Sequence, residues 1–273
     1  AKIKESLAQP WTPPAREESS AAIGKKRSMR ADVVYGRANV PLPETPTNAQ
    51  LTHLDALPEP LLRANGTASR QERTALASAL RSYMSSGDAE DIEPLVEFTQ
   101  TYPRSIWTPG LQLNLGMIAY DTGYFSGALT FWRAAWDGAK DQTDEHSVAV
   151  ANRAIAEYAK MCARIGRKED LATLFTEVEG RVFQGTSRII LDSAREGYWS
   201  MLHKEGVAYR CGPYALTNVA AVLRPDHQTG HAEFLQKVVS PESGFSIDQV
   251  QAMSSERSEE NTSELQSQGN LVC

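Results

Sequence analysis

Cysteine is scarce in this chain. The 273 residues include three cysteines, Cys162, Cys211 and Cys273. So small a number provides neither a disulfide framework nor a cluster of metal ligands, and we expect no metal site and no cofactor. Cys162 lies inside a helical pattern, which favours a buried structural thiol. Cys211 is therefore the cysteine of chemical interest.

Long apolar runs are also missing. No stretch approaches the roughly 20 apolar residues that a membrane-spanning helix needs, so we expect no membrane span in these residues. The N-terminus has no apolar signal-peptide core, but the first residue is Ala1 and not methionine. We expect the front of the protein to be cut, so the missing signal leaves the localisation open.

Positive charge is sparse as well. The formal net charge is −6, and it becomes −4 without residues 257–273, which carry one Arg and three Glu. No basic field exists to attract nucleic acid, so we expect no nucleic-acid partner. The 41% of hydrophobic and 23% of charged residues are ordinary for a soluble globular chain of one large or two small domains.

Residues 1–66 lack helical periodicity and contain many breakers. Eight prolines interrupt this region: Pro10, Pro13, Pro14, Pro41, Pro43, Pro46, Pro58 and Pro60. We predict an extended arm over the next domain, or a linker, with short helices near 1–8 and 50–56. The segment at 57–61, Leu-Pro-Glu-Pro-Leu, should be extended.

A helical region is predicted from 67 to 185. Ser69 and Glu72 form a capping-box pattern, and apolar residues then recur at helical spacing to about residue 202. No segment there reads as a convincing strand. Breaks fall near Gly87, 103–109, Gly123, Asp141 and Gly166.

The breaks indicate a repeat. Around Gly123 the chain has Leu115 and Gly116 before the turn, then Ala128 and Trp132 after it. This arrangement resembles a tetratricopeptide repeat, in which small residues let two helices pack closely and a glycine turns the chain. Weaker units centre on Gly87 and Gly166, at spacings of 36 and 43 residues, compared with about 34 for that class. An irregular helical bundle without repeat ancestry is the alternative.

A peptide or protein segment is the partner expected for such a region, because helical repeats usually bind peptides on a concave face. Trp132 and Trp136 lie four residues apart on one helical face and could line that surface. The alternative is that both tryptophans belong to the core.

The segment around Cys211 suggests a nucleophile. It reads Tyr209-Arg210-Cys211-Gly212-Pro213 and leads into a helical pattern with Leu216, Val219, Ala220 and Leu223. A helix start favours a thiolate, since it offers unpaired N–H groups and the positive end of the peptide dipoles. A backbone N–H there can also bind the oxyanion of acyl transfer. A structural cysteine at a helix start remains an alternative.

This segment, with the run at 244–250 that implies a second small helix, resembles papain-like cysteine peptidases. The resemblance is to the bacterial peptidases of this class that cleave double-glycine leader peptides from bacteriocins. The resemblance covers about 205–253 and implies an α+β fold, in which helices come first and a sheet carrying the base follows. We therefore predict a partial peptidase domain at 186–256, joined to the repeats by a helix at 187–202.

Within this resemblance, Cys211 matches the family's nucleophile, but other positions differ from the family's pattern. Glu205 stands where the family has a glutamine that donates to the oxyanion, and an ionised carboxylate can only accept. Arg210 replaces an acidic residue. The family's His and Asp would lie beyond Glu256. His227 and His231 are expected to be exposed and outside hydrogen-bond reach of Cys211.

The tail at 257–273 resembles the translation of a sequencing adapter, with Asn261 where His is expected. We therefore expect a non-native, disordered segment; a natural polar C-terminus is the alternative.

Two functions are predicted for this mainly α chain, which we interpret as a piece of a longer bacterial protein. The first is peptide-bond hydrolysis by Cys211 in the complete protein, with this chain inactive because it lacks the sheet and the base. The second is a non-enzymatic binding scaffold of helical repeats with a degenerate peptidase-like module.

Overall fold

The computed structural model describes residues 42–204, 206–223, 231–241 and 243–255. Over these residues the chain is helical and contains no strand, so the mainly α prediction is confirmed. The helices are α2 (Asn48–Thr52), α3 (Arg70–Ser86), α4 (Glu93–Thr101), α5 (Thr108–Asp121), α6 (Phe125–Ala139), α7 (Glu145–Arg164), α8 (Lys168–Glu177), α9 (Gly185–His203), α10 (Cys211–Leu223) and α11 (His231–Lys237). Residues 247–255 are also helical.

The chain divides into two compact units. The first comprises Ala1–Met161 with Val182–Leu191, and the second comprises Cys162–Arg181 with Asp192–Cys273. The helix predicted at 187–202 is α9, which begins in the first unit and ends in the second.

The helix boundaries follow local sequence. Ser69 caps α3, because its Oγ accepts from Glu72 N at 3.1 Å and its N donates to Glu72 Oε2 at 2.6 Å. That backbone hydrogen bond also lowers the pKa of the Glu72 carboxyl. At the other end of α3, Gly87 has φ of 75°, a conformation that costs glycine little. The predicted capping box and break are therefore confirmed.

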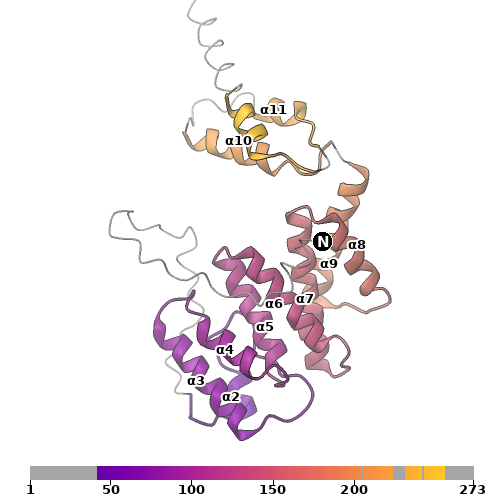
Figure 1. The fold of residues 1–273 in the computed structure, drawn as a ribbon. Helices are drawn as coiled ribbons and strands as arrows, with labels where there is room; N and C mark the ends of the chain where they lie inside the picture. The colour runs from indigo at the N-terminus through magenta and orange to yellow at the C-terminus, as the bar shows by residue number, and fades with distance from the viewer. Residues whose placement is uncertain (1–41, 205, 224–230, 242, 256–273) are drawn as a thin grey trace, which may run out of the picture. The chain divides into compact units, whose positions relative to one another are not determined.

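The first unit is built on helix hairpins, of which α5 and α6 are the most closely packed pair (Figure 1). Gly123, at φ of 91°, turns the chain between them. The two helices approach closely at Gly116, where an added Cβ would lie 2.4 Å from Cδ1 of Trp132. Trp132 is fully buried, so its indole fills the space that the missing side chain leaves.

The described part of the predicted arm packs into the core of the first unit. Leu51, Leu57 and Leu61 are buried, and the helix expected near 50–56 is α2. Residues 53–69 form neither helix nor strand. Hydrogen bonds hold them instead: Glu59 N donates to Asn114 Oδ1 at 2.8 Å, and Ala64 N donates to the carbonyl of Ile106 at 2.7 Å. The helix predicted at 1–8 lies outside the described residues.

The second unit contains α8, the end of α9, α10 and α11. Its α8 and α9 meet through an aromatic pair, because the ring centroids of Phe175 and Tyr198 are 5.4 Å apart. The guanidinium of Arg195 lies 5.7 Å from the Phe175 ring and adds a cation–π contact. Among the residues described here, no helix is long and apolar enough to cross a membrane.

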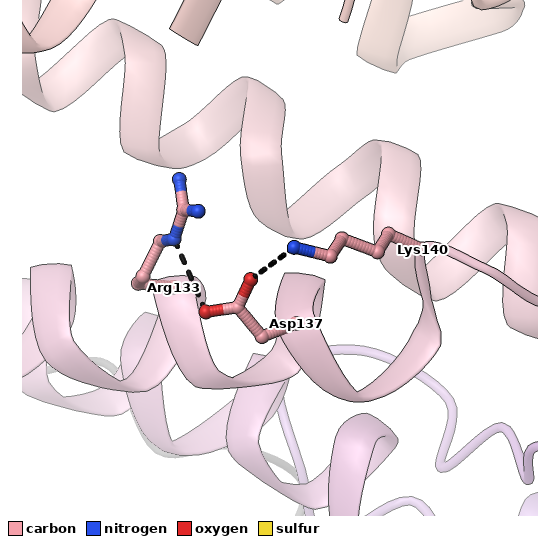
Figure 2. Close-up of polar contacts among 3 residues, drawn as sticks. All are labelled: Arg133, Asp137 and Lys140. Atoms are coloured by element: carbon pink, nitrogen blue, oxygen red, sulfur yellow. Dashed lines mark hydrogen bonds and ion pairs between the residues drawn. The ribbon is translucent and has the colours of Figure 1, made fainter. Parts of the chain in front are cut away.

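Asp137 on α6 lies between two cations. Its carboxylate contacts Arg133 Nε at 3.2 Å and Lys140 Nζ at 2.8 Å (Figure 2). All three side chains are solvent-exposed to a substantial degree, and surface ion pairs contribute about 0–1 kcal/mol.

We therefore expect Asp137→Asn to lower the free energy of unfolding of the first unit by less than about 1 kcal/mol, and less still in high salt. Chemical denaturation followed by circular dichroism at low and high ionic strength measures this effect. A loss of several kcal/mol would contradict the view that these pairs are screened by water.

Candidate functional site

Cys211 is the first residue of α10. The first hydrogen bond of the helix runs from Tyr214 N to the carbonyl of Arg210 at 3.0 Å, which makes Arg210 the N-cap. Pro213 lies in the first turn and is buried, whereas Cys211 is exposed. The N–H groups of Cys211 and Gly212 fall in the turn where a helix supplies no acceptor of its own. The thiol is thus presented at a helix start, as its sequence predicts.

The turn before α10 is held from several sides. Tyr209 is in the left-handed region with φ of 61°, and its ring covers Gly166, where an added Cβ would lie 2.5 Å from Cε1. Ser240 Oγ donates to the carbonyl of Ala208. Arg210 donates from Nη1 to the carbonyl of Leu235 at 2.8 Å and from Nη2 to that of Gly206 at 2.9 Å. The side chain of Arg210 therefore anchors the residue next to the thiol.

The second small helix expected after Gly244 is present. Ser246 and Gln249 cap it reciprocally, with Ser246 N donating to Gln249 Oε1 at 2.8 Å and Gln249 N donating to Ser246 Oγ at 3.2 Å. This helix packs on the start of α10, since a Cβ at Gly212 would lie 2.6 Å from Val250 Cγ2. Glycine beside Cys211 thus permits a close helix contact.

The polar contact of Cys211 is with a backbone carbonyl: its Sγ lies 4.0 Å from the oxygen of Arg164. Ile165, the residue after Arg164, lines a hollow of about 510 Å³ in the second unit. The other lining residues are Gly166, Lys168, Glu169, Tyr209 and Ser243. A space of this size admits part of a peptide ligand. Tyr209, two residues before Cys211, is among the lining residues, whereas Cys211 is not.

Glu205 and His227 lie outside the described residues, as does the side chain of His231. Within the part of the chain that the structure describes, no three His, Cys, Asp or Glu side chains are grouped to hold a metal ion. Cys162 is fully buried, as its place in the helical pattern predicts.

A larger cavity, which sequence reasoning missed, lies in the first unit. Its volume is about 640 Å³, and its lining combines the segment near Glu59, one face of α7, and the start of α9. The lining residues are Glu59, Pro60, Leu62, Leu113, Thr143, Glu145, Val148, Ala149, Val150, Asn152, Arg153, Val182, Gln184, Thr186 and Ser187. The one signal in the sequence is the spacing of Arg153, Glu157 and Lys160, which lie on one face of a helix.

These charges form a network at the wall of the cavity. Arg153 Nη2 contacts Glu59 Oε1 at 3.0 Å and Glu157 Oε1 at 3.1 Å. Lys160 pairs with the second oxygen of Glu157, whose side chain is only 3% exposed. A buried carboxylate requires such partners, so the network fixes the guanidinium in place.

Asp144 immediately precedes α7, between the cavity-lining residues Thr143 and Glu145. Its Oδ1 accepts from Ser147 N at 3.1 Å. Desolvation raises the pKa of this carboxyl, but hydrogen bonds from the Ser147 side chain and backbone outweigh it, and the net pKa is lowered.

Trp132 and Trp136 do not line a binding surface. They are 0% and 2% exposed, so both belong to the core, the alternative that their sequence pattern left open. No protein-family model, curated protein or solved structure matches the chain.

Proposed function

We propose that Cys211 is the nucleophile of a cysteine-peptidase-like module that hydrolyses peptide bonds in the complete protein. The observation that carries this proposal is the exposed thiol at the first position of α10. The family resemblance around Cys211, which includes the small second helix, also supports a nucleophilic role for this cysteine.

In this mechanism the thiolate attacks the scissile carbonyl carbon and forms a tetrahedral oxyanion. A backbone N–H of the first turn of α10 stabilises that oxyanion. The C–N bond then breaks, the amine leaves with a proton from an acid, and a thioester remains on Cys211. Water hydrolyses the thioester, giving the acid product and the free thiol. None of the described residues is assigned as the acid or base, so Cys211 supplies the nucleophile alone.

The test is the alkylation rate of Cys211 with iodoacetamide at pH 7 in a Cys273→Ser background. A helix start stabilises an anion by about 0.3–1 kcal/mol, so Cys211 should react about two- to fivefold faster in the folded protein than in a peptide of residues 206–216. Cys162 should react only after unfolding, because it is buried. Peptide mass fingerprinting separates the two sites.

The matched control is Cys211→Ser, which should abolish labelling of the folded protein while leaving its circular dichroism unchanged. A folded Cys211 that reacts more slowly than the same cysteine in the peptide would contradict an activated thiol and favour a structural cysteine at a helix start.

The second candidate is a non-enzymatic scaffold in which the helical region recruits a peptide. The hairpin of α5 and α6 carries the residues that resemble a tetratricopeptide repeat, including Gly116 packed on Trp132. The observation that favours this candidate is the cavity of about 640 Å³ in the same unit. A scaffold requires a bound peptide but no reactive thiol, so peptide binding by the Cys211→Ser variant separates it from the enzyme.

A further inference from the structure

Arg210, the residue before the thiol, joins the end of one helix to the start of another. Its Nη1 donates to the carbonyl of Leu235 at 2.8 Å, in the last turn of α11. Its own carbonyl accepts the first hydrogen bond of α10, from Tyr214 N at 3.0 Å. The last four carbonyls of a helix have no partner within it, and a cation is favourable there. The side chain of Arg210 therefore caps α11 while its backbone begins α10.

The same guanidinium holds the loop that leads into α10. Its Nη2 donates to the carbonyl of Gly206 at 2.9 Å, and Ser240 N donates to that carbonyl at 3.2 Å. Ser240 is only 4% exposed, and its Oγ donates to the carbonyl of Ala208. Between these anchored residues, Tyr209 has a φ of 61°, a strained value that persists only where neighbouring contacts enforce it. These hydrogen bonds therefore fix the backbone before the thiol.

An arginine at this position also leaves the first turn of α10 without a side-chain cap. The usual N-cap residues accept a hydrogen bond from this turn through a side-chain oxygen. A guanidinium has donors only, so Arg210 cannot accept from Gly212 N. An ionised acidic side chain, which the resemblance implies here, could accept from that N–H but could donate to neither carbonyl. The N–H groups at the thiol are thus left for an anion, either the thiolate or the oxyanion of acyl transfer.

We infer that Arg210 is a positioning residue for the reaction of Cys211. Its two hydrogen bonds to backbone carbonyls, and not its charge, hold the start of α10 in the geometry in which the helix end stabilises a thiolate. This inference rests on the nucleophilic role proposed above, and it names the residue that maintains that role.

The test measures alkylation of Cys211 by iodoacetamide in the full chain and in a peptide of residues 206–216 that carries the same substitution, in a Cys273→Ser background. At pH 7 the wild-type chain should react about two- to fivefold faster than its peptide, and Arg210→Met should lose this excess because methionine donates no hydrogen bond. The wild-type excess should fade near pH 9, where an ordinary cysteine thiol is itself mostly ionised. Arg210→Lys keeps the charge but not the planar fork of donors, so it should react more slowly than wild type.

Two controls accompany these variants. Cys162 is fully buried in the same unit, so its protection from iodoacetamide shows that a variant remains folded. Lys237→Met removes a positive charge from an exposed position of α11, where Lys237 Nζ contacts Glu233 Oε1 at 2.8 Å. This variant should alkylate at Cys211 at the wild-type rate, because both carbonyl contacts of Arg210 remain.

The outcomes separate this inference from the function on which it rests. A wild-type chain that reacts no faster than its peptide would overturn both. A fast wild type with an equally fast Arg210→Met or Arg210→Lys would leave the nucleophile in place and overturn the positioning role of Arg210. A slow Lys237→Met would assign the effect to charge, and labelling of Cys162 in Arg210→Met would assign it to the fold of the whole unit; either result would overturn the inference.

Discussion

Replacing Trp132 by alanine should lower the free energy of unfolding of the first unit by about 3–5 kcal/mol, the usual cost of emptying a fully buried aromatic site. The indole is 0% exposed, covers Gly116 and lies 5.9 Å from the Tyr120 ring centre. Helix α5 cannot close the space, because its own contacts with α4 and α6 hold it. Urea denaturation followed by far-ultraviolet circular dichroism measures the loss.

Two variants sharpen this prediction. Trp132→Phe should cost less than Trp132→Ala, since it retains most of the ring and removes an Nε1 that is buried without a hydrogen-bond partner. Trp199→Ala on α9 should cost less than about 1 kcal/mol, because Trp199 is 50% exposed. Equal losses at Trp132 and Trp199 would contradict the assignment of Trp132 to the core.

Replacing Gly110 by alanine should destabilise the first unit by about 2 kcal/mol or more. An added Cβ would lie 2.1 Å from the carbonyl oxygen of Leu62, and a backbone atom cannot rotate away as a side chain can. Alanine is otherwise about 1 kcal/mol better than glycine within a helix, so the measured loss understates the cost of the clash by about that amount. Denaturant unfolding measures the net effect.

Gly138 on α6 provides the matched control. Its added Cβ would meet the side chain of Pro109 at 3.1 Å, and that ring can shift by a few tenths of an ångström. Gly138→Ala should therefore change stability by less than about 1 kcal/mol. If Gly110→Ala were equally mild, the segment at 59–62 would be free to move away from α5.

The Gly110→Ala variant also tests whether packing in the core affects the cavity. Leu62 is both the residue whose carbonyl touches Gly110 and a lining residue of the cavity. If this cavity is the binding surface of the proposed scaffold, displacing Leu62 should weaken peptide binding. Such a variant would show whether the packed arm is part of the binding surface.

Local sequence determined the helices of this protein. Ser69 and Glu72 mark the start of α3, and the glycines at 87, 123 and 166 take the left-handed conformation that ends a helix or turns the chain. The start of α10 at Cys211 belongs to the same class of prediction. Capping and positive φ depend on neighbours within a few residues, so an isolated sequence already contains the information.

Tertiary structure alone decided which of these residues meet. Leu57 and Leu61 of the predicted arm are buried in the core, and Asn114 and Ile106 accept hydrogen bonds from the backbone of Glu59 and Ala64 in the same arm. Trp132 and Trp136 became core residues and not a binding surface. Both outcomes depend on contacts between segments far apart in sequence, which periodicity does not specify.

The same distinction applies to the two sites. The sequence placed Cys211 at a helix start, but only the fold set its sulfur beside the Arg164 carbonyl. The pairing of Glu59 with Arg153, and the buried donor left beside it, had no counterpart in any sequence pattern. A helix needs its own few residues to form, whereas a cavity exists only where distant segments fold around the same space.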